Sequence, residues 1–572
     1  MVRSTFPHGV TIREAQPQPQ SVITLDEEKL VYVGSAPIHL LDDPSEASMQ
    51  ELKQVRSLTD VNRHFGPRAL GYSIPDFYWV CLQYGCKEAY FVNIFDPATH
   101  TGSKAQVLTF DGNDRIDLGN LLEYSSIVLT DVTTVEPATQ SWTDGAYDTG
   151  ESAIANVIVQ SADGNTTYTE EDYIVDGGVI AVTSWGAIDP NADTLIGYDR
   201  AGTTTHTITT DYTLTETTPT NPNTDSAYIT SYTYNHVVID GVTLTSGDKV
   251  FITYTHAHPK FLSNADAIGT VAGDGTRTGL QLLKEMRATF GFEPTHISAD
   301  RFTEAAVVNA LESLANDLRA QYHVTIPRNT TVSDAIAGRA DDQGKVKNAF
   351  TSDPRANLYV DWVEVPDPTD AGGMILQPLH WHGMAQRYRT TRKLGFWWSI
   401  SSQAIEGIQG IEVKRTMSRE DPTADNQTLS EDGSYITIFY DYGLGYVFDG
   451  NHNAAHPSQT NGSQFAAVQN ARDVILRSLK RSAQTAIDKP LQRTSALSLE
   501  RRFNSYFAEM SNPDRAQGQA IGTSTASIDI PDNTASEQRL GRLYVLLQIA
   551  YLTPINTIVL IEEPIEIDLL AA

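Results

Sequence analysis

Cysteine is nearly absent from this chain, whose 572 residues include two, Cys81 and Cys86. Two cysteines exclude a disulfide framework, and the C-x4-C spacing is not a standard zinc-binding spacing. Two interpretations stay open. Either both are reduced thiols in the core or at the surface, as is typical of a reducing compartment, or they form a redox-sensitive disulfide between copies of the chain. A non-reducing gel of the assembled protein separates the two, because only the second gives a ladder.

Long hydrophobic runs are absent as well. No apolar run reaches the roughly 18–20 residues that span a bilayer. The N-terminus shows no basic segment followed by an apolar core, so we predict no signal peptide. We therefore expect a protein that is made and assembled in a cytoplasm.

Positive charge is scarce, with 41 Lys and Arg residues against 71 Asp and Glu residues and a net charge of −30. Such a surface repels phosphate backbones and anionic membranes, so we predict no direct nucleic-acid partner and no stable membrane association. The charge also helps to keep a free copy of the chain soluble. With 40% apolar residues, a chain of this length has enough hydrophobic surface for two to four domains.

Catalytic motifs are missing too. The sequence has no Gly-x-Ser-x-Gly elbow, no His-Glu-x-x-His and no credible Ser-His-Asp arrangement. Residues 273–279 look like a phosphate-binding loop, but they lack the Lys-Ser/Thr pair of that motif, so we interpret them as a turn and a helix start. We predict neither enzymatic activity nor a cofactor.

Two pairs of histidines remain as candidate metal ligands. His380 and His382 are predicted to lie on one face of a strand, and Asp361 or Glu364 would have to supply a third ligand. The other pair, at positions 452 and 456, falls in a predicted loop. For both pairs the core or interface interpretation is favoured, and we predict no metal site.

The chain begins and resumes with alternating strands and helices, which is typical of α/β folds. A buried strand at 30–37, an apolar helix at 77–85 and a second strand at 89–94 form the crossover unit of a parallel sheet. Further elements follow from hydrophobic periodicity. We expect helical faces within 280–290, 307–318, 468–479 and 499–510, and strands at 295–298, 322–327, 356–363 and 543–552.

Residues 101–255 differ in composition, because they are rich in Thr, Asp, Gly and Tyr and almost free of Lys. Alternating runs at 156–160 and 249–254 predict strands, and Asp163-Gly164-Asn165 predicts a turn. We expect an inserted all-β, sandwich-like region here.

Both ends of the chain carry short strand-like segments. Residues 7–14 precede a Gln- and Pro-rich stretch, and residues 556–563 follow Pro554. Strands with few ties to their own domain can add to the sheet edge of another chain. This pattern favours a structural lattice protein over an enzyme.

Several short motifs occur in the order found in the contractile tail sheath proteins of bacteriophages, a family that includes the sheaths of R-type bacteriocins and related injection systems. The chain is similar to that family over about 7–100 and 262–565. The matching segments are Pro-His-Gly-Val at 7–10, Val-Gly-Ser-Ala-Pro at 33–37, Val-Asn-Arg-His-Phe-Gly at 61–66, Leu-Tyr-Val-Asp-Trp-Val at 358–363, Gly-Phe-Trp-Trp at 395–398 and Gly-Leu-Gly-Tyr-Val-Phe-Asp-Gly at 443–450.

The chain also departs from the family pattern. His8 interrupts the usual Pro-Gly pair, and residues 401–403 replace a typical Pro-Ala-Asn. Residues 101–255 match nothing in the family's core, and in this family such insertions decorate the outside of the tube.

The resemblance implies a multidomain α+β and α/β fold in which two α/β sheath-core domains carry a β-rich insertion and two extended β-arms. We expect an N-terminal arm at 1–29, a discontinuous α/β domain at 30–100 and 256–385, the β-rich outer insertion at 101–255, an inner α/β domain at 386–552 and a C-terminal arm at 553–572.

The resemblance further implies a subunit of the virion that polymerises into stacked hexameric rings around an inner tail tube protein. Baseplate and tail terminator proteins are its further expected partners. By position, the strands exchanged between neighbouring subunits are Val10, Thr11 and Ile12 at one end and Ile558, Val559, Leu560 and Ile561 at the other. The alternatives are a secreted or surface β-rich adhesin that binds carbohydrate, and a carbohydrate-acting enzyme, for which no carboxylate pair stands out.

Overall fold

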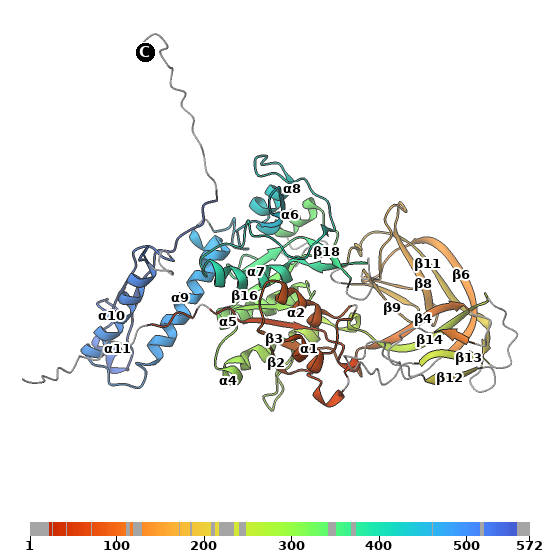
Figure 1. Ribbon diagram of the computed structural model, residues 1–572, viewed down its shortest axis with the longest axis horizontal. Coiled ribbons are helices and arrows are strands. Elements are labelled where there is room, and N and C mark those ends of the chain that lie inside the picture. The colour runs from red at the N-terminus through yellow and green to blue at the C-terminus, as the bar shows by residue number, and fades with distance from the viewer. Residues whose placement is uncertain are drawn as a thin grey trace, which may run out of the picture. The chain divides into compact units, whose positions relative to one another are not determined.

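The computed structural model describes residues 22–25, 27–41, 43–69, 71–109, 115–117, 128–170, 172–183, 186–206, 212–216, 234–239, 247–340, 351–367, 373–459, 461–514 and 520–556. The chain divides into two compact units (Figure 1). Among the described residues, the large unit comprises those within 27–394, 398–469 and 554–556, and the helical unit comprises those within 22–25, 395–397 and 470–553.

An eight-stranded mixed sheet organises the large unit. Its central strands pair in parallel, and an antiparallel strand closes each edge. In spatial order the strands are β2 (Leu52–Val55), β3 (Ala89–Asn93), β1 (Leu30–Gly34), β15 (His296–Ala299), β16 (Gln321–Thr325), β17 (Ala356–Tyr359), β21 (Tyr435–Asp441) and β22 (Gly445–Asp449).

The helices of the large unit are mostly short. They are α1 (Leu58–His64), α2 (Ser73–Gln83), α3 (Asn264–Ile268), α4 (Met286–Phe290), α5 (Ala305–Leu318), α6 (Val332–Ala340), α7 (Leu379–Lys393) and α8 (Asp425–Gln427), with a 3-10 turn η4 (Gly279–Glu285) directly before α4.

Strand β1 shows how helices cover both faces of this sheet. All five of its residues are buried, as expected for a central parallel strand. Val31 and Val33 pack in one hydrophobic cluster and Leu30 and Tyr32 in another. Since successive side chains of a strand point to opposite faces, the two clusters lie on opposite sides of the sheet. Helix α5 and η4 contribute to the first cluster and α2 and α7 to the second, which gives three layers.

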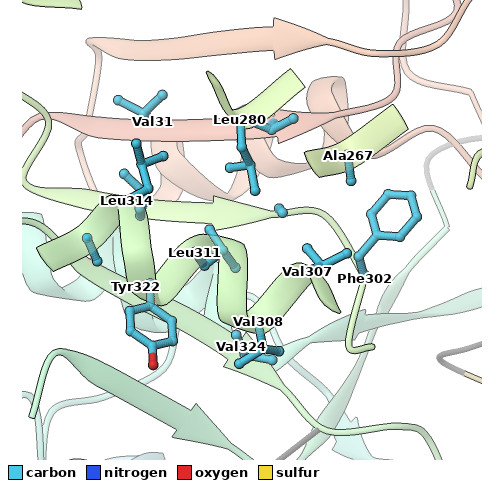
Figure 2. Close-up of a cluster of buried hydrophobic side chains, with 14 of the residues drawn as sticks. Val31, Ala267, Leu280, Phe302, Val307, Val308, Leu311, Leu314, Tyr322 and Val324 are labelled. Carbon is cyan, nitrogen blue, oxygen red and sulfur yellow. The ribbon is translucent and has the colours of Figure 1, made fainter. Parts of the chain in front are cut away.

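Figure 2 shows the first of these clusters, where α5 packs on the sheet. Val307, Leu311 and Leu314 lie on one face of α5 and are buried against Val31 and Leu280. The spacing of these residues along α5 is that of an amphipathic helix, so the prediction for 307–318 is confirmed.

The described residues of 101–257 form strands and no helix. The largest sheet here has the order β4 (Thr101–Thr109), β14 (Lys249–Ala257), β6 (Val128–Gln140), β11 (Thr194–His206) and β8 (Ile154–Ser161), all antiparallel (Figure 1). Two three-stranded sheets accompany it. They are β7 (Ala146–Asp148), β10 (Val179–Val182) and β9 (Tyr173–Asp176), and β12 (Tyr212–Glu216), β13 (Tyr234–Ile239) and β5 (Arg115–Asp117).

Some predictions from the sequence are wrong in detail. The single strand expected at 356–363 is two strands, because the chain leaves the mixed sheet after β17 and continues as β18 (Trp362–Pro366) in a separate sheet with β19 (Met374–Pro378) and β20 (Gly410–Ile411). The helical face expected at 280–290 is a 3-10 turn followed by the short α4. The parallel strand–helix–strand unit at 30–94 is confirmed.

The helical unit consists of two long helices and a small sheet. The elements are α9 (Ala466–Gln484), of which the part from residue 470 belongs to this unit, α10 (Arg493–Met510), β23 (Thr525–Ser527), α11 (Ala535–Arg539) and β24 (Leu546–Gln548). Val474, Ile475 and Leu479 of α9 pack with Leu499 and Phe503 of α10. Both long helices were predicted from their apolar periodicity, and both predictions are confirmed.

The described structure is a mixed α/β protein with one mixed sheet and several small sheets, which agrees with the predicted fold class at this level. Among the described residues, no helix combines the length and the apolar character that a membrane crossing requires.

Candidate functional site

The candidate site is the two-stranded sheet of the helical unit. β23 and β24 pair antiparallel, with Thr525 opposite Gln548 and Ser527 opposite Leu546. A bridge between Ile521 and Tyr551 continues the ladder. The strand predicted at 543–552 is therefore present, although regular pairing is confined to its middle.

One face of this segment is covered and the other is open. Leu543, Val545, Leu547, Ile549 and Tyr551 pack against the core of α9 and α10. The residues between them point away from that core, as the two-residue period of a strand requires. Large apolar side chains on this outer face are Tyr544, Leu546 and Leu552, which are 40%, 45% and 46% exposed.

A side chain of α10 occupies the outer edge of β23. The Asn504 amide donates from Nδ2 to the carbonyl oxygen of Ala526 at 2.8 Å and accepts from its N–H at Oδ1 at 2.7 Å. Both polar groups of Ala526 thus point away from β24, which makes Ala526 and Leu547 a non-hydrogen-bonded pair. By the same geometry, the N–H and C=O of Leu547 point away from β23.

A second asparagine bonds the backbone of the chain just before β24, where the pairing with β23 has ended. Asn533 donates to the carbonyl oxygen of Tyr544 at 2.7 Å and accepts from its N–H at 2.8 Å. In both places a side-chain amide makes the two hydrogen bonds that a neighbouring strand would make. Nothing in the sequence distinguishes Asn504 and Asn533 from other asparagines, and the sequence analysis missed both.

The outer edge of β24 has no neighbouring strand among the described residues. The N–H and C=O groups that point to this edge, such as those of Leu547, are a template for one more strand. Chemically, this edge can accept an extended peptide through backbone hydrogen bonds, and the uncovered face beside it can take apolar side chains.

The chain just after the N-terminal segment packs in the same unit. Val22 is buried in the α9–α10 core, and the N–H of Leu25 donates to Oγ of Ser478 at 2.8 Å. Thr24 lies 3.5 Å from the hydroxyl of Tyr506. The described residues next to the N-terminal segment, 22–25, therefore belong to the same unit as β24, whereas residues 554–556, which precede the C-terminal segment, belong to the large unit.

The predicted strand residues at the ends of the chain, Val10, Thr11, Ile12, Ile558, Val559, Leu560 and Ile561, lie outside the described residues. Their pairing stays a prediction, and the structure offers an edge on which to test it.

The prediction that His380 and His382 share one face of a strand is wrong, because both lie in α7. Residues two apart on a helix point in different directions. His380 hydrogen-bonds Thr325 at 2.8 Å, whereas His382 hydrogen-bonds Tyr84 at 3.1 Å. Burial lowers the pKa of each imidazole to about 3, so both are neutral residues of the core.

The second histidine pair lies in a loop, as predicted. The rings of His452 and His456 stack at 3.9 Å, and burial lowers the pKa of both. Within the described ranges, no group of three or more His, Cys, Asp or Glu side chains is arranged to hold a metal ion.

A buried chain of hydrogen bonds crosses three strands of the mixed sheet. His296 of β15 bonds Glu28 through Nε2 at 3.0 Å and His323 of β16 through Nδ1 at 2.9 Å, and His323 bonds Tyr359 of β17 at 3.0 Å. An ionised Glu28 cannot donate, so His296 donates to its carboxylate through Nε2.

Helix α7 completes the environment of this carboxylate. Thr391 donates to Glu28 at 2.6 Å, and the Arg387 guanidinium lies 3.9 Å away. Burial alone would raise the pKa of Glu28, but His296 and Arg387 hold it well below its usual range.

The cavity next to His323, Tyr359 and Arg387 measures about 20 Å³, room for about one water molecule. A substrate has no place there, so we assign this chain of polar groups to the structural core.

Both cysteines also belong to the core. Cys81 and Cys86 are fully buried in the cluster that α2 forms on the mixed sheet, and neither is in a disulfide. Burial raises the pKa of the Cys81 thiol well above its usual value, which makes it less reactive. A disulfide between copies would require this core to open.

Comparison with known proteins gives a consistent result. No protein-family model matches the chain. It is 27% identical over 508 residues to the tail sheath protein of Burkholderia phage BcepMu, covering 88% of this chain and 86% of that protein. It is 21% identical over 296 residues to the tail sheath protein of Escherichia phage P2, covering 52% and 69%.

A solved structure extends the likeness to the fold. The helical sheath of the anti-feeding prophage, determined by cryo-electron microscopy in its contracted state, matches with a TM-score of 0.50 and 11% identity over 98% of this chain and 99% of that one. At this identity the likeness is one of fold. Together with the phage proteins, it confirms the resemblance to contractile tail sheath proteins that the sequence motifs carry.

Proposed function

We propose that this relative of the tail sheath proteins is a structural subunit of a contractile tail. Its copies polymerise around an inner tail tube, and contraction of the polymer drives that tube through the host envelope. The similarity to a phage tail sheath protein over 88% of the chain and the fold shared with a contracted helical sheath support this function. The role is mechanical, without catalysis or a cofactor.

The open outer edge of β24 is the observation that carries the proposal. It lies in the unit that also holds residues 22–25, next to the N-terminal segment. Neighbouring subunits are linked when one donates a strand, Val10 to Ile12 or Ile558 to Ile561, to this edge of another. Backbone pairing carries the link, so single side-chain changes in the donated strands have milder effects than deletion of a strand.

The proposed architecture assigns a mechanical role to each part. Residues 30–100 and 256–385 form one α/β sheath domain and 386–552 the inner one, with 1–29 and 553–572 as arms. The all-β segment at 101–255, which we propose is sandwich-like, decorates the outside. The arms keep the lattice continuous while the bodies rotate, and newly buried interface supplies the free energy of contraction.

The proposed partners follow from the role. Copies of the chain stack as hexameric rings, the inner tail tube protein fills the channel, and baseplate and tail terminator proteins bind the two ends. The sheath is part of the virion and is assembled in the cytoplasm of the host bacterium. The net charge of −30 supports the absence of direct nucleic-acid contacts and of stable membrane association.

The first test is negative-stain electron microscopy of the purified chain at high concentration, with and without a cognate tail tube. We expect striated hollow tubes from the natural chain. Deletion of residues 1–20 should leave a folded monomer that forms none, because the donated strand is gone while the described core is untouched. Tubes of normal length from this truncation would contradict strand exchange.

A pair of substitutions tests the acceptor. Leu546→Lys places a charge on the outer face of β24, next to the incoming strand, and should abolish or strongly shorten the tubes. Leu540→Lys is the matched control, because Leu540 is 65% exposed and lies outside the strand. Equal tube lengths for the two variants would exclude β24 as the acceptor.

A further inference from the structure

Charge is distributed unevenly along the chain. Residues 470–553 contain 11 Lys and Arg against 8 Asp and Glu, a balance of +3, while the whole chain carries −30. The rest of the chain therefore carries −33. Residues 101–255 alone hold 22 acidic and 4 basic residues, a balance of −18.

The positive excess is concentrated where α9 turns into α10. Residues 480–502 hold six Lys and Arg and two Asp and Glu. We define the basic tip as the exposed side chains Arg481, Ile487, Lys489, Leu491, Arg493 and Arg501. Hydrogen bonds from Arg502 to the carbonyl oxygen of Ser482 and to Thr485, at 3.3 and 2.8 Å, hold the end of α9 against α10.

The cations of the basic tip have no carboxylate partner within ion-pair distance in the described part of the chain. Two large apolar residues stand beside them, Ile487 at 65% and Leu491 at 42% exposure. Exposed cations next to exposed aliphatic side chains form a surface suited to an acidic protein face with an apolar centre.

Helix stability does not account for these charges. Arg481 is in the last turn of α9, where a cation is favourable, but Arg493 is the first residue of α10, where a cation opposes the helix dipole. The first turn of α10 contains no acidic residue to offset it. A position that disfavours the local fold is better explained by a contact made in assembly.

We infer that the basic tip docks on an acidic surface of residues 27–469 of a second copy of the chain. This inference rests on the proposed function. Copies with a net charge of −30 repel one another, so a homopolymer needs a contact of opposite sign, and residues 470–553 are the segment with a positive balance. The same repulsion disfavours an anionic membrane or a nucleic acid as the occupant.

Zero-length carbodiimide cross-linking of the assembled polymer tests this contact. The polymer is formed from equal amounts of unlabelled and nitrogen-15-labelled full-length chain, so that mixed-isotope peptide pairs report links between copies. We expect Lys489 joined to Asp or Glu residues within 27–469 in such pairs. Polymers that give other inter-copy links, but none from Lys489, would overturn the inference and leave the proposed function standing.

Charge reversal supplies the second readout. In pelleting assays at 50 mM NaCl, Lys489→Glu with Arg493→Glu should raise the chain concentration at half-assembly by about tenfold. This difference between the natural chain and the double variant should shrink as the salt concentration rises, because salt screens exposed charges. Arg472→Glu, an exposed position on the same helix α9, is the matched control and should assemble normally.

Three results would overturn the inference. The first is that the double variant assembles like the control at every salt concentration. The second is that the natural chain binds phosphatidylserine vesicles through Lys489 and Arg493, while substitution of these two residues leaves assembly unchanged. The third is that the natural chain forms no polymer with or without a tail tube, and this result would also contradict the proposed function. The milder pair Lys489→Gln with Arg493→Gln repeats the comparison if charge reversal lowers the yield of folded protein.

Discussion

The two units of this protein differ in how their buried parts respond to protons. Among the residues whose burial the structure describes, the large unit has five buried histidines, namely His296, His323, His380, His382 and His452. The described residues of the helical unit include no histidine, and their buried acidic and basic side chains are Asp473 and Arg477. The difference teaches that one chain can combine a unit whose core depends on pH with a unit whose core does not depend on histidine.

The direction of the pH dependence follows from the histidines. Burial lowers the pKa of His380 and His382 to about 3 and that of His39 to about 4, against 6.5 in the unfolded chain. The unfolded state therefore binds more protons below pH 6.5. The stability that these groups contribute is present above pH 6.5 and is lost as the pH falls towards the folded values.

Acidification should have the largest effect on the comparison. Between pH 6.5 and 5 each of these three histidines costs the large unit about 2 kcal/mol. Hydrogen exchange with mass spectrometry, corrected for the pH dependence of intrinsic rates, should show protection lost in peptides of β1, β15 and α7 before peptides of α9 and α10. Parallel loss in both units would mean that they unfold as one and would break the comparison.

Removal of the Glu28 charge should have the second largest effect. Glu28→Gln leaves the Arg387 guanidinium buried without its carboxylate, which should cost about 3–5 kcal/mol in urea unfolding of the large unit. Glu27→Gln is the control, because the Glu27 side chain is 81% exposed and its pair with Lys29 is solvated. The control should change stability by less than about 1 kcal/mol. Similar changes in the free energy of unfolding for both variants would show that the buried Glu28 carboxylate contributes no more to stability than an exposed one.

The smallest predicted effect is in the helical unit. Asn504→Ala leaves the N–H and C=O of Ala526, a residue only 4% exposed, without partners, and should cost about 2 kcal/mol. Asn533→Ala should cost less than about 1 kcal/mol, because water can replace the amide at the exposed Tyr544. Urea unfolding followed at both units should show the change in the helical unit. An equal loss of stability in both variants would show that the cost of removing the amide does not depend on burial of the strand edge.

The sequence could predict the elements whose side chains repeat with a clear period. Helices α5, α9 and α10 each present one apolar face to a core, so their spacing is visible without a structure. Helix α7 is different, because most of the polar side chains in its first nine residues are buried, including His380, His382 and Gln386. A helix whose polar residues face the core has no amphipathic signature, which is why this segment was assigned to a strand.

The candidate site was only partly predictable for a related reason. Alternation in 543–552 indicates a strand, but the feature that leaves one edge of the small sheet open and closes the other depends on where two asparagine amides lie in space. The separation between Asn504 and Ala526 is 22 residues, and no local pattern encodes such a contact.

The asparagine at the edge of β23 also limits how many strands from other chains can join the small sheet. Because Asn504 already holds both backbone groups of Ala526, a second strand cannot join at that point on the β23 side. Strands can then be added only in series beyond β24, and a second arrival pairs with the first rather than with the host subunit. A network connected through such a sheet would lengthen without branching at the β23 side of this junction.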